Sequence, residues 1–315
     1  MTQAQPTIHT PASRRRHKLR MITRNGMLYL FLLPALLYIL LFQYVPLYGI
    51  QIAFKDFVAI EGIWNSPWVG FKHFSAFFSS YRFWDLIRNT LTLSLYRIAI
   101  GFPMPILLAL LLNYTTFRRL GKFAQTATYA PHFISVVVMV GMLLLFLSPS
   151  NGVINKLLGF IGIDPVFFMG EAGYFKHIYV WSGIWQTTGW SSIIYIAALT
   201  SVSPELHEAA VIDGANKLER IWHIDVPSIL PTAIILLVMD VGRVMNVGFE
   251  KVLLMQNDLN LPASEIISTY TYKVGLLNAQ YSYSTAIGLF NNIINFILLI
   301  SVNKLAKRIS GTGLW

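Results

Sequence analysis

The sequence predicts an all-α membrane protein with about six transmembrane helices and both termini in the cytoplasm. Of its 315 residues, 55% are hydrophobic and only 12% are charged, and the mean hydropathy is +0.56. Soluble domains carry charge on about a quarter of their residues. The apolar residues also fall in blocks of about 20, the length that a helix needs to cross a bilayer. Lipid is therefore predicted to be the main solvent of a single membrane domain.

Six segments are apolar and long enough to span the membrane: residues 27–54, 89–113, 131–147, 178–200, 229–247 and 285–302. They are predicted to be helices, because unpaired backbone groups in lipid cost several kcal/mol each and the segments lack the alternation of barrel strands. The domain organisation follows from these spans. A transmembrane domain is expected at 27–303, between a basic N-terminal tail at 1–26 and a C-terminal tail at 304–315.

The positions of Lys and Arg predict how the spans are oriented. Basic residues gather in the N-terminal tail, in the link after the second span and at the C-terminus, whereas acids are more frequent in the links at 55–88, 148–177 and 248–284. Cytoplasmic flanks are enriched in Lys and Arg, so the three basic flanks are predicted to be cytoplasmic. The net charge of +10 is thus interpreted as a topology signal and not as a nucleic-acid surface. The basic residues of the three flanks are Arg14, Arg15, Arg16, Lys18, Arg20, Arg24, Arg118, Arg119, Lys122, Lys304, Lys307 and Arg308.

Residue types that carry catalysis are sparse in this chain. It has no cysteine, and its histidines have no partner at a metal-ligand spacing such as H-E-x-x-H, so no metal site is predicted. It also has no G-x-x-x-x-G-K-[ST] phosphate loop. We therefore expect neither catalysis nor a cofactor in this chain, and nucleotide energy would have to arrive from another protein.

One predicted cytoplasmic link, at residues 203–231, is acidic instead of basic. Ser203 is a candidate N-cap with Pro204 in the first helical position, and Gly214 can supply a reversed backbone angle after that helix. A second short helix is expected over residues 217–224, ending before Pro227. Two small helices at an angle would form a knob that the groove of another protein could enclose.

The same link carries a family motif. Its residues resemble the EAA motif of ABC importer permeases, with Val226 in place of the motif's Leu. The matching residues are Glu208, Ala209, Ala210, Asp213, Gly214, Ile224 and Pro227. Longer stretches such as GFPMPILLALLLN, MNVGFEKVLLMQN and LAKRISGTGLW are similar to binding-protein-dependent sugar permeases, closest to the LplB-type branch that serves oligosaccharides and polysaccharide fragments.

The resemblance implies a type I ABC importer permease (MetI-like) fold, in which this link is a coupling helix seated in a cleft of an ATPase. It also implies a set of partners: a second homologous permease, a cytoplasmic ABC ATPase dimer that binds ATP and Mg, an extracellular solute-binding lipoprotein and an oligosaccharide substrate. The location that it implies is the cell membrane of a Gram-positive bacterium.

Charged side chains inside a span indicate a candidate substrate path, because they are costly in lipid. Asp240, Arg243 and Asn246 recur every three residues on the fifth span, so we expect them on one helix face, where Asp240 and Arg243 can pair. They would line a path or gate, or instead form a buried pair that locks helix packing. Arg97 on the second span is interpreted as snorkelling towards a membrane surface.

Aromatic and amide side chains extend the candidate path. Trp185 and Trp190 lie among Thr, Ser and Gln on the fourth span, a composition suited to the apolar faces and hydroxyls of sugars. Asn291 and Asn295 place two amides one helical turn apart on the sixth span. Helix packing is an alternative role for the tryptophans, and interhelical hydrogen bonding for the asparagines.

Three other functions are alternatives to an oligosaccharide importer. An ABC importer for a non-sugar solute would share the same motif. An ion-driven secondary carrier needs coupling carboxylates near the midplane, whereas Asp240 is the single acid inside a predicted span and lies beside Arg243. A membrane enzyme would need clustered catalytic acids, histidines or metal ligands, and no such cluster is found in the sequence.

Overall fold

A computed structural model describes residues 25–315, and these residues form helices and loops apart from one antiparallel bridge between Lys55 and Trp68. The basic tail predicted at 1–26 lies outside the described residues except for its last two. The long helical segments are α2 (Gly26–Ile39) with η1 (Leu40–Tyr44) and η2 (Val45–Phe54), α5 (Phe83–Gly101) with α6 (Pro103–Asn113), α10 (Ala172–Thr200), α13 (Val226–Val241) and α17 (Tyr281–Ser310).

Shorter helices fill the connections between the long ones. They are α3 (Gly62–Asn65), α4 (Lys72–Phe78), α7 (Arg118–Tyr129), η3 (Ala130–Phe133), α8 (Val136–Phe146), α9 (Val153–Phe160), α11 (Pro204–Ile212), α12 (Lys217–Arg220), η4 (Ile221–Asp225), α14 (Phe249–Met255), α15 (Leu261–Ser264), α16 (Ile267–Tyr272) and η5 (Lys273–Leu277).

Four helical stretches of the described part are long and apolar enough to cross a membrane, or five when the bent pair of α7 and α8 counts as one span. They are Gly26–Phe54, Phe83–Asn113, Lys217–Val241 and Tyr281–Ser310. The helix α10 has 29 residues but is less apolar, because Gln186, Thr187 and Thr188 lie in its middle. The membrane character of the chain is confirmed, and the count of six spans stays a prediction.

The third predicted span, at 131–147, is not one continuous helix. The helical segment that ends at Phe133 and α8 meet at 101°. The break lies at Ile134 and Ser135, where the Ser135 hydroxyl accepts a hydrogen bond from the Val138 amide at 3.3 Å and so starts a new helix. The Ile134 carbonyl, left free by the break, accepts from the Gln186 side chain at 2.8 Å.

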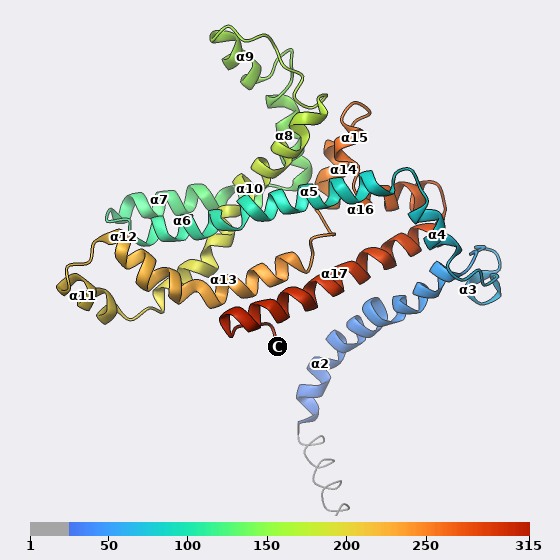
Figure 1. Cartoon of the computed structure of the whole chain (residues 1–315), viewed down its shortest axis with the longest axis horizontal. Helices are drawn as coiled ribbons and strands as arrows, with labels where there is room; N and C mark the ends of the chain where they lie inside the picture. Colours follow the sequence, from blue (N-terminus) through green and yellow to red (C-terminus); the bar gives the residue numbers. More distant parts are fainter. Residues whose placement is uncertain (1–24) are drawn as a thin grey trace, which may run out of the picture.

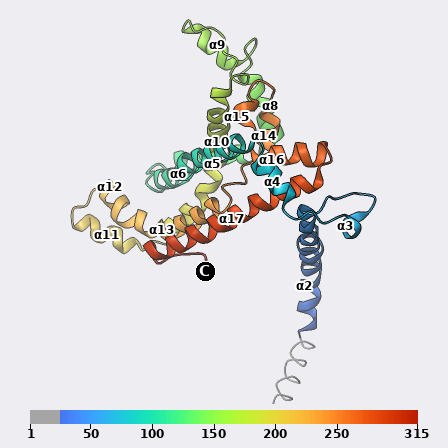
Figure 2. The same ribbon diagram turned by 45° about the vertical axis from the view of Figure 1, so that its right-hand side comes forward.

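The long helices run roughly along one axis of the molecule, as Figure 1 shows for α5, α6, α13 and α17. The helices α11 and α12 lie at one end of this axis, and α3 and α4 lie at the other, in both Figure 1 and Figure 2. The helix α10 crosses the set and packs against α5, α6, α7 and α13. The acidic link at 203–231 is therefore at the opposite end from the link at 55–88, in keeping with their predicted opposite sides.

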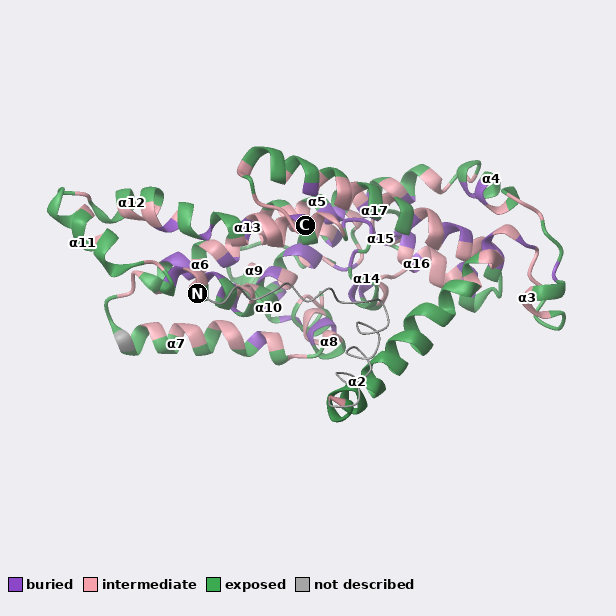
Figure 3. Ribbon diagram, turned by 90° about the horizontal axis from the view of Figure 1, so that it is seen from below, coloured by how far each residue is buried: buried purple, intermediate pink, exposed green. Residues whose placement is uncertain are grey.

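Packing within the chain is modest for a molecule of this hydrophobicity. One apolar core joins α5, α8, α10 and α14, a second joins α4, α5, α16 and α17, and a third joins α6, α10 and α13. Figure 3 shows α2 exposed along its whole length. In the most apolar stretch of Gly26–Phe54, 0% of the residues are buried. Such surface requires lipid or another apolar protein surface to cover it.

Candidate functional site

Local chemistry defines the acidic link between α10 and α13. The Ser203 hydroxyl accepts from the Glu205 amide at 3.3 Å, with Pro204 following the cap, as expected for a helix start. Gly214 has a φ of +83°, which confirms the predicted left-handed turn after α11. Asn216 and Glu219 then form a reciprocal capping box that starts α12. We call residues 203–231 the coupling loop, after the role that the resemblance of the sequence implies.

The second helix of the coupling loop does not end before Pro227, contrary to the prediction. The helix α12 widens into the π turn η4, in which the Val226 amide donates to the Ile221 carbonyl, and continues directly into α13. Pro227 lies in the first turn of α13, a position that tolerates a residue without an amide hydrogen. Helical structure thus continues without a break from the coupling loop into α13.

A buried carboxylate lies at the base of the coupling loop. Asp225 is 0% exposed, and its Oδ2 accepts a hydrogen bond from the Tyr114 hydroxyl at 2.7 Å. The His207 Nε2 lies 3.3 Å from its Oδ1. Burial, together with the hydrogen bond to Asp225, raises the pKa of Tyr114 to about 12, so the hydroxyl stays protonated and can donate. We call Tyr114, His207 and Asp225 the polar junction, because they join the end of α6, α11 and the start of α13.

Sequence reasoning missed this junction. Asp225 was visible only as one acid among several in the loop, and nothing local marked it as buried. Its partners lie 111 residues away at Tyr114 and on the neighbouring helix at His207. Only the packing of α6 against the loop brings them together.

The outer surface of the coupling loop is exposed and partly apolar. The motif residues Glu208, Ala209, Asp213 and Gly214 are exposed, and α11 has no buried residue. Ala210 and Ile224 are half-buried. Large apolar side chains also face solvent on this loop: Leu206, Val211, Ile212, Leu218 and Trp222. An apolar patch rimmed by charge is typical of a protein-binding surface.

A second candidate site is a cavity of about 460 Å³ between the joint of α5 and α6, α10 and the end of α13. It brings together three predicted path residues, Trp190, Asp240 and Arg243. Trp185 lines two other, more apolar cavities instead. We call the first of these spaces the central cavity.

The predicted shared helix face of Asp240, Arg243 and Asn246 was wrong. The helix α13 ends at Val241, and the chain continues as a turn in which the Arg243 amide donates to the Asp240 carbonyl at 3.1 Å and the Asn246 amide to the Arg243 carbonyl at 2.9 Å. Arg243 and Asn246 therefore lie beyond the helix. Broken helices within a membrane protein are tolerated where they line a cavity or are satisfied by neighbours.

Side chains from other helices satisfy this unwound turn. The Val244 carbonyl accepts from the Ser94 hydroxyl of α5, and the Met245 amide donates to the Asn295 side chain of α17 at 3.0 Å. The Asn291 amide donates to the Asn246 side chain at 2.6 Å. Both asparagines of α17 thus make the contacts expected for their alternative role, interhelical hydrogen bonding.

The ion pair made by Asp240 also differs from the prediction. Asp240 lies 3.6 Å from Arg97 of α5, and within the described part of the chain no carboxylate lies within 4.0 Å of Arg243. Arg97 was expected to reach towards a membrane surface. The end of α13 turns Arg243 off the helix face of Asp240, whereas α5 brings Arg97 alongside.

Trp190 is held in place by its neighbours. Its ring stacks on His132 with centroids 4.5 Å apart and meets Phe133 edge-on at 5.7 Å. The adjacent Gly189 lets α10 approach α7 closely, because a Cβ at that position would overlap the Thr128 carbonyl. Trp190 remains 44% exposed, so part of the indole is open towards the cavity.

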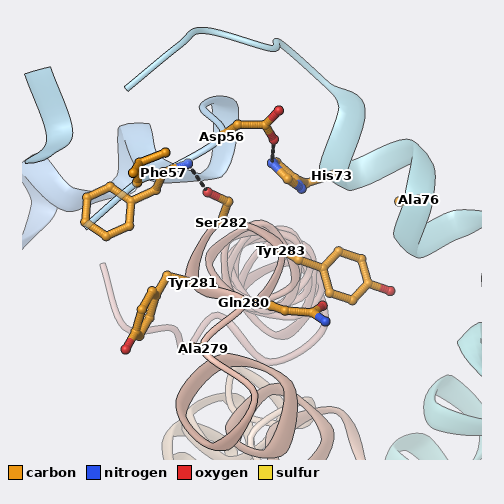
Figure 4. A pocket seen from close by; sticks show the side chains of 10 residues that line it. Asp56, Phe57, His73, Ala76, Ala279, Gln280, Tyr281, Ser282 and Tyr283 are labelled. Atoms are coloured by element: carbon orange, nitrogen blue, oxygen red, sulfur yellow. Dashed lines mark hydrogen bonds and ion pairs between the residues drawn. The ribbon is translucent and has the colours of Figure 1, made fainter. Parts of the chain in front are cut away.

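A further open cavity of about 480 Å³ lies at the start of α17, at the end of the molecule that carries α3 and α4 (Figure 4). The Phe57 amide donates to the Ser282 hydroxyl at 2.9 Å, which ties the link after η2 to α17. Asp56 lies 2.6 Å from Lys72 and 3.0 Å from His73. The hydrogen bond from Lys72 lowers the pKa of Asp56 below its ordinary value. This cavity therefore has a largely neutralised charge.

No group of three or more His, Cys, Asp or Glu side chains within residues 25–315 is arranged to hold a metal ion.

Comparisons with known proteins converge on one class. Residues 101–311 match the family described as "binding-protein-dependent transport system inner membrane component". Protein LplB of Bacillus subtilis is 42% identical over 294 residues, covering 93% of this chain and 92% of that protein. The polygalacturonan/rhamnogalacturonan transport system permease protein YteP of the same organism is 42% identical over 302 residues, covering 96% of this chain and 94% of that protein.

Solved structures agree with these relatives. A chain of a bacterial ABC transporter involved in the import of the acidic polysaccharide alginate superposes with a TM-score of 0.88 at 41% identity, covering 93% of this chain and 99% of that chain. A second structure, of the bacterial alginate transporter with an alginate pentasaccharide-bound periplasmic protein, gives a TM-score of 0.87 at 41% identity and covers 94% and 99% of the two chains.

Proposed function

Because the chain belongs to the family of binding-protein-dependent transport system inner membrane components, we propose that it is a permease subunit of an ATP-driven importer that moves an oligosaccharide inward by alternating access. The transmembrane domain is assigned to residues 27–303, and the coupling loop and C-terminal tail are assigned to the cytoplasm. The membrane is the cell membrane of a Gram-positive bacterium.

The observation that carries this proposal is the exposed coupling loop at one end of the molecule (Figure 3). Its apolar side chains and the exposed motif residues Glu208, Ala209, Asp213 and Gly214 form a projecting surface that the described residues 25–315 leave uncovered, with Ala210 half-buried beside it. An ATPase cleft that receives the loop would bury this surface. ATP and Mg are then bound by that partner, because the present chain has no phosphate loop.

The structure offers a physical route from the coupling loop to the central cavity. Movement of α11 is passed to Asp225 through His207, and Asp225 lies in the turn that continues into α13. The other end of α13 is the unwound turn that carries Arg243 into the cavity. Closure of the ATPase can thereby change the shape of the cavity without contacting it.

The central cavity suits a sugar by its chemistry. Trp190 offers an indole for the apolar C–H face of a sugar ring, and Ser191, Asp240 and Arg243 offer partners for hydroxyl groups. The proposed second permease would complete the path beside this cavity. The extracellular solute-binding lipoprotein would deliver the oligosaccharide to this path.

Charge reversal in the motif tests the coupling assignment. In cells or vesicles that contain the complete importer, Glu208→Lys is expected to abolish uptake while the protein stays in the membrane, because the ATPase cleft loses a carboxylate partner. Glu171→Lys provides a matched control, since Glu171 is an exposed carboxylate at the start of α10 and away from the loop. Normal uptake by the Glu208→Lys variant would contradict the assignment.

A further inference from the structure

Polar side chains form a ladder between α5 and α10 that the proposed function does not use. Arg88, Thr92 and Tyr96 are spaced by four residues, so they lie on one face of α5. The Lys176 ammonium donates to the Thr92 hydroxyl at 2.6 Å, and the Tyr96 hydroxyl meets His177 Nδ1 at 2.9 Å. These hydrogen bonds join α5 to α10 along this face.

The ladder continues inward through a tryptophan. The Trp181 indole donates to the Tyr96 hydroxyl at 3.1 Å and remains 49% exposed. We call these six residues the basic track: Arg88, Thr92, Tyr96, Lys176, His177 and Trp181. About 20 Å of α5 separate Arg88 from Gly101, which lines the central cavity, at about 1.5 Å per residue.

Within residues 25–315, no carboxylate lies within 4.0 Å of the two cations at the outer end of the basic track. Neither Arg88 nor Lys176 takes part in an ion pair within the described part of the chain. Burial first, and then the positive charge of Arg88, lower the pKa of Lys176. The nearest acid along α5, Asp85, lines a different pocket with Arg82 and Glu265.

The inner end of the track has the same sign. Arg97 follows Tyr96 on α5 and is paired with Asp240, so these two charges largely offset each other. Arg243 is the remaining charge that lines the central cavity. A cation within a transmembrane region is costly unless an anion or water compensates it.

The geometry points to a binding path for the carboxylates of an acidic oligosaccharide, running from Arg88 and Lys176 along the basic track to Arg243. This inference rests on the proposed import function and names its substrate class as hexuronate chains. A hexuronate combines a carboxylate, hydroxyls and an apolar ring face. In this path the arginines and Lys176 bind the carboxylate, and Thr92, Tyr96 and His177 bind the hydroxyls. The indoles of Trp181 and Trp190 bind the apolar ring face.

Transport of defined trimers by the complete importer in vesicles tests this inference. The probes are galacturonate trimer, mannuronate trimer and a galacturonate trimer whose carboxyl groups have been reduced to alcohols. Arg88→Gln, Lys176→Gln and Arg243→Gln are each expected to lower kcat/KM for an acidic trimer at least about tenfold, the effect of losing about 1.4 kcal/mol of binding energy. Arg243→Lys should retain more activity than Arg243→Gln, because it keeps the charge.

Lys156→Gln on α9 is the matched control, since Lys156 is exposed and belongs to neither the basic track nor the central cavity. It removes the same charge and should leave uptake unchanged. ATP hydrolysis by each variant, measured in the same vesicles, shows that the complex is assembled and folded.

The possible outcomes separate the two proposals. If the unaltered importer transports the reduced trimer as well as the acidic ones, or if the three Gln variants transport acidic trimers normally, the acidic path is wrong and the import function stands. The Gln variants could instead lose transport of acidic and neutral trimers equally, by an amount that depends on the anionic lipid content of the vesicles. That result would assign the cations to lipid binding and also overturn the inference. If the unaltered importer hydrolyses ATP but moves no oligosaccharide of either kind, the proposed function itself is wrong.

Discussion

Removal of one hydroxyl group at the polar junction should loosen the link between ATP hydrolysis and transport. The Tyr114 hydroxyl is the hydrogen-bond donor to Asp225 Oδ2, and Asp225 is fully buried. In Tyr114→Phe the Oδ2 of Asp225 loses this donor. The end of α6 then no longer holds the base of the coupling loop.

The size of the effect follows from the geometry. A hydrogen bond to a charged group contributes about 1.5–3 kcal/mol, and Tyr114 is only half-buried, so the lower end of the range applies. A loss of about 1.5 kcal/mol shifts the equilibrium between the docked and released loop about tenfold. We expect ATP hydrolysis to continue in Tyr114→Phe while the oligosaccharide moved per ATP falls severalfold.

The assay is the ratio of oligosaccharide uptake to phosphate release in vesicles that contain the complete importer. Tyr44→Phe is the matched control, because Tyr44 is an exposed tyrosine in η1, far along the chain from the coupling loop. Asp225→Asn keeps an acceptor for Tyr114 and should be milder than Asp225→Ala. An unchanged ratio in Tyr114→Phe, or an equal fall in Tyr44→Phe, would refute the role of the junction.

Two further predictions concern the packing around α10. Gly189→Ala should destabilise the protein by about 1–3 kcal/mol, because the new methyl group would overlap the Thr128 carbonyl. Gly173→Ala on the same helix is the control, because a Cβ at that position meets no atom within 4 Å. Thermal unfolding of the two variants is compared. Equal melting temperatures for Gly189→Ala and Gly173→Ala would contradict the close contact between Gly189 and Thr128. Burial lowers the pKa of Lys251 in α14 from 10.5 to about 7. Between these two pH values the unfolded chain therefore binds more protons than the folded chain. The free energy of unfolding should then rise with pH, by at most about 1.4 kcal/mol per pH unit. Lys251→Met should remove most of this rise between about pH 7 and about pH 9; a variant that keeps the full slope would show that another group titrates.

Local sequence rules were sufficient for the beginning of the coupling loop. Ser203, Pro204 and Gly214 act within a few residues of their own position, through a cap, a fixed φ and a positive φ, and the structure confirms all three features. The apolar blocks likewise located most of the long helices. Both kinds of signal depend only on neighbouring residues and on the thickness of lipid.

The end of α13 could not be read in the same way. The apolar block continues to Val247, but the helix ends at Val241, because Ser94 and Asn295 supply hydrogen bonds to the turn that follows. Those partners come from the second and the last long segments of the chain. The same long-range cause hid the pairing of Asp240 with Arg97. Tertiary contacts decide such features, and a single sequence does not display them.

In the proposed function, the two ends of α13 together explain how a loop on one side of the membrane can act on a cavity within it. At its start, Asp225 binds side chains of α6 and α11; past its end, the turn after Val241 binds α5 and α17. The 16 residues between them form a rod about 24 Å long, at about 1.5 Å per residue.

Pro231 lies about one turn into α13 and leaves one carbonyl without its usual partner, so the helix bends most easily beside the loop. A displacement at Asp225 must therefore be absorbed at Pro231 or appear at Arg243. The unwound turn is held by hydrogen bonds to side chains, which can change partners at a smaller cost in free energy than the main-chain hydrogen bonds of the helix. The turn is therefore where the cavity can change shape.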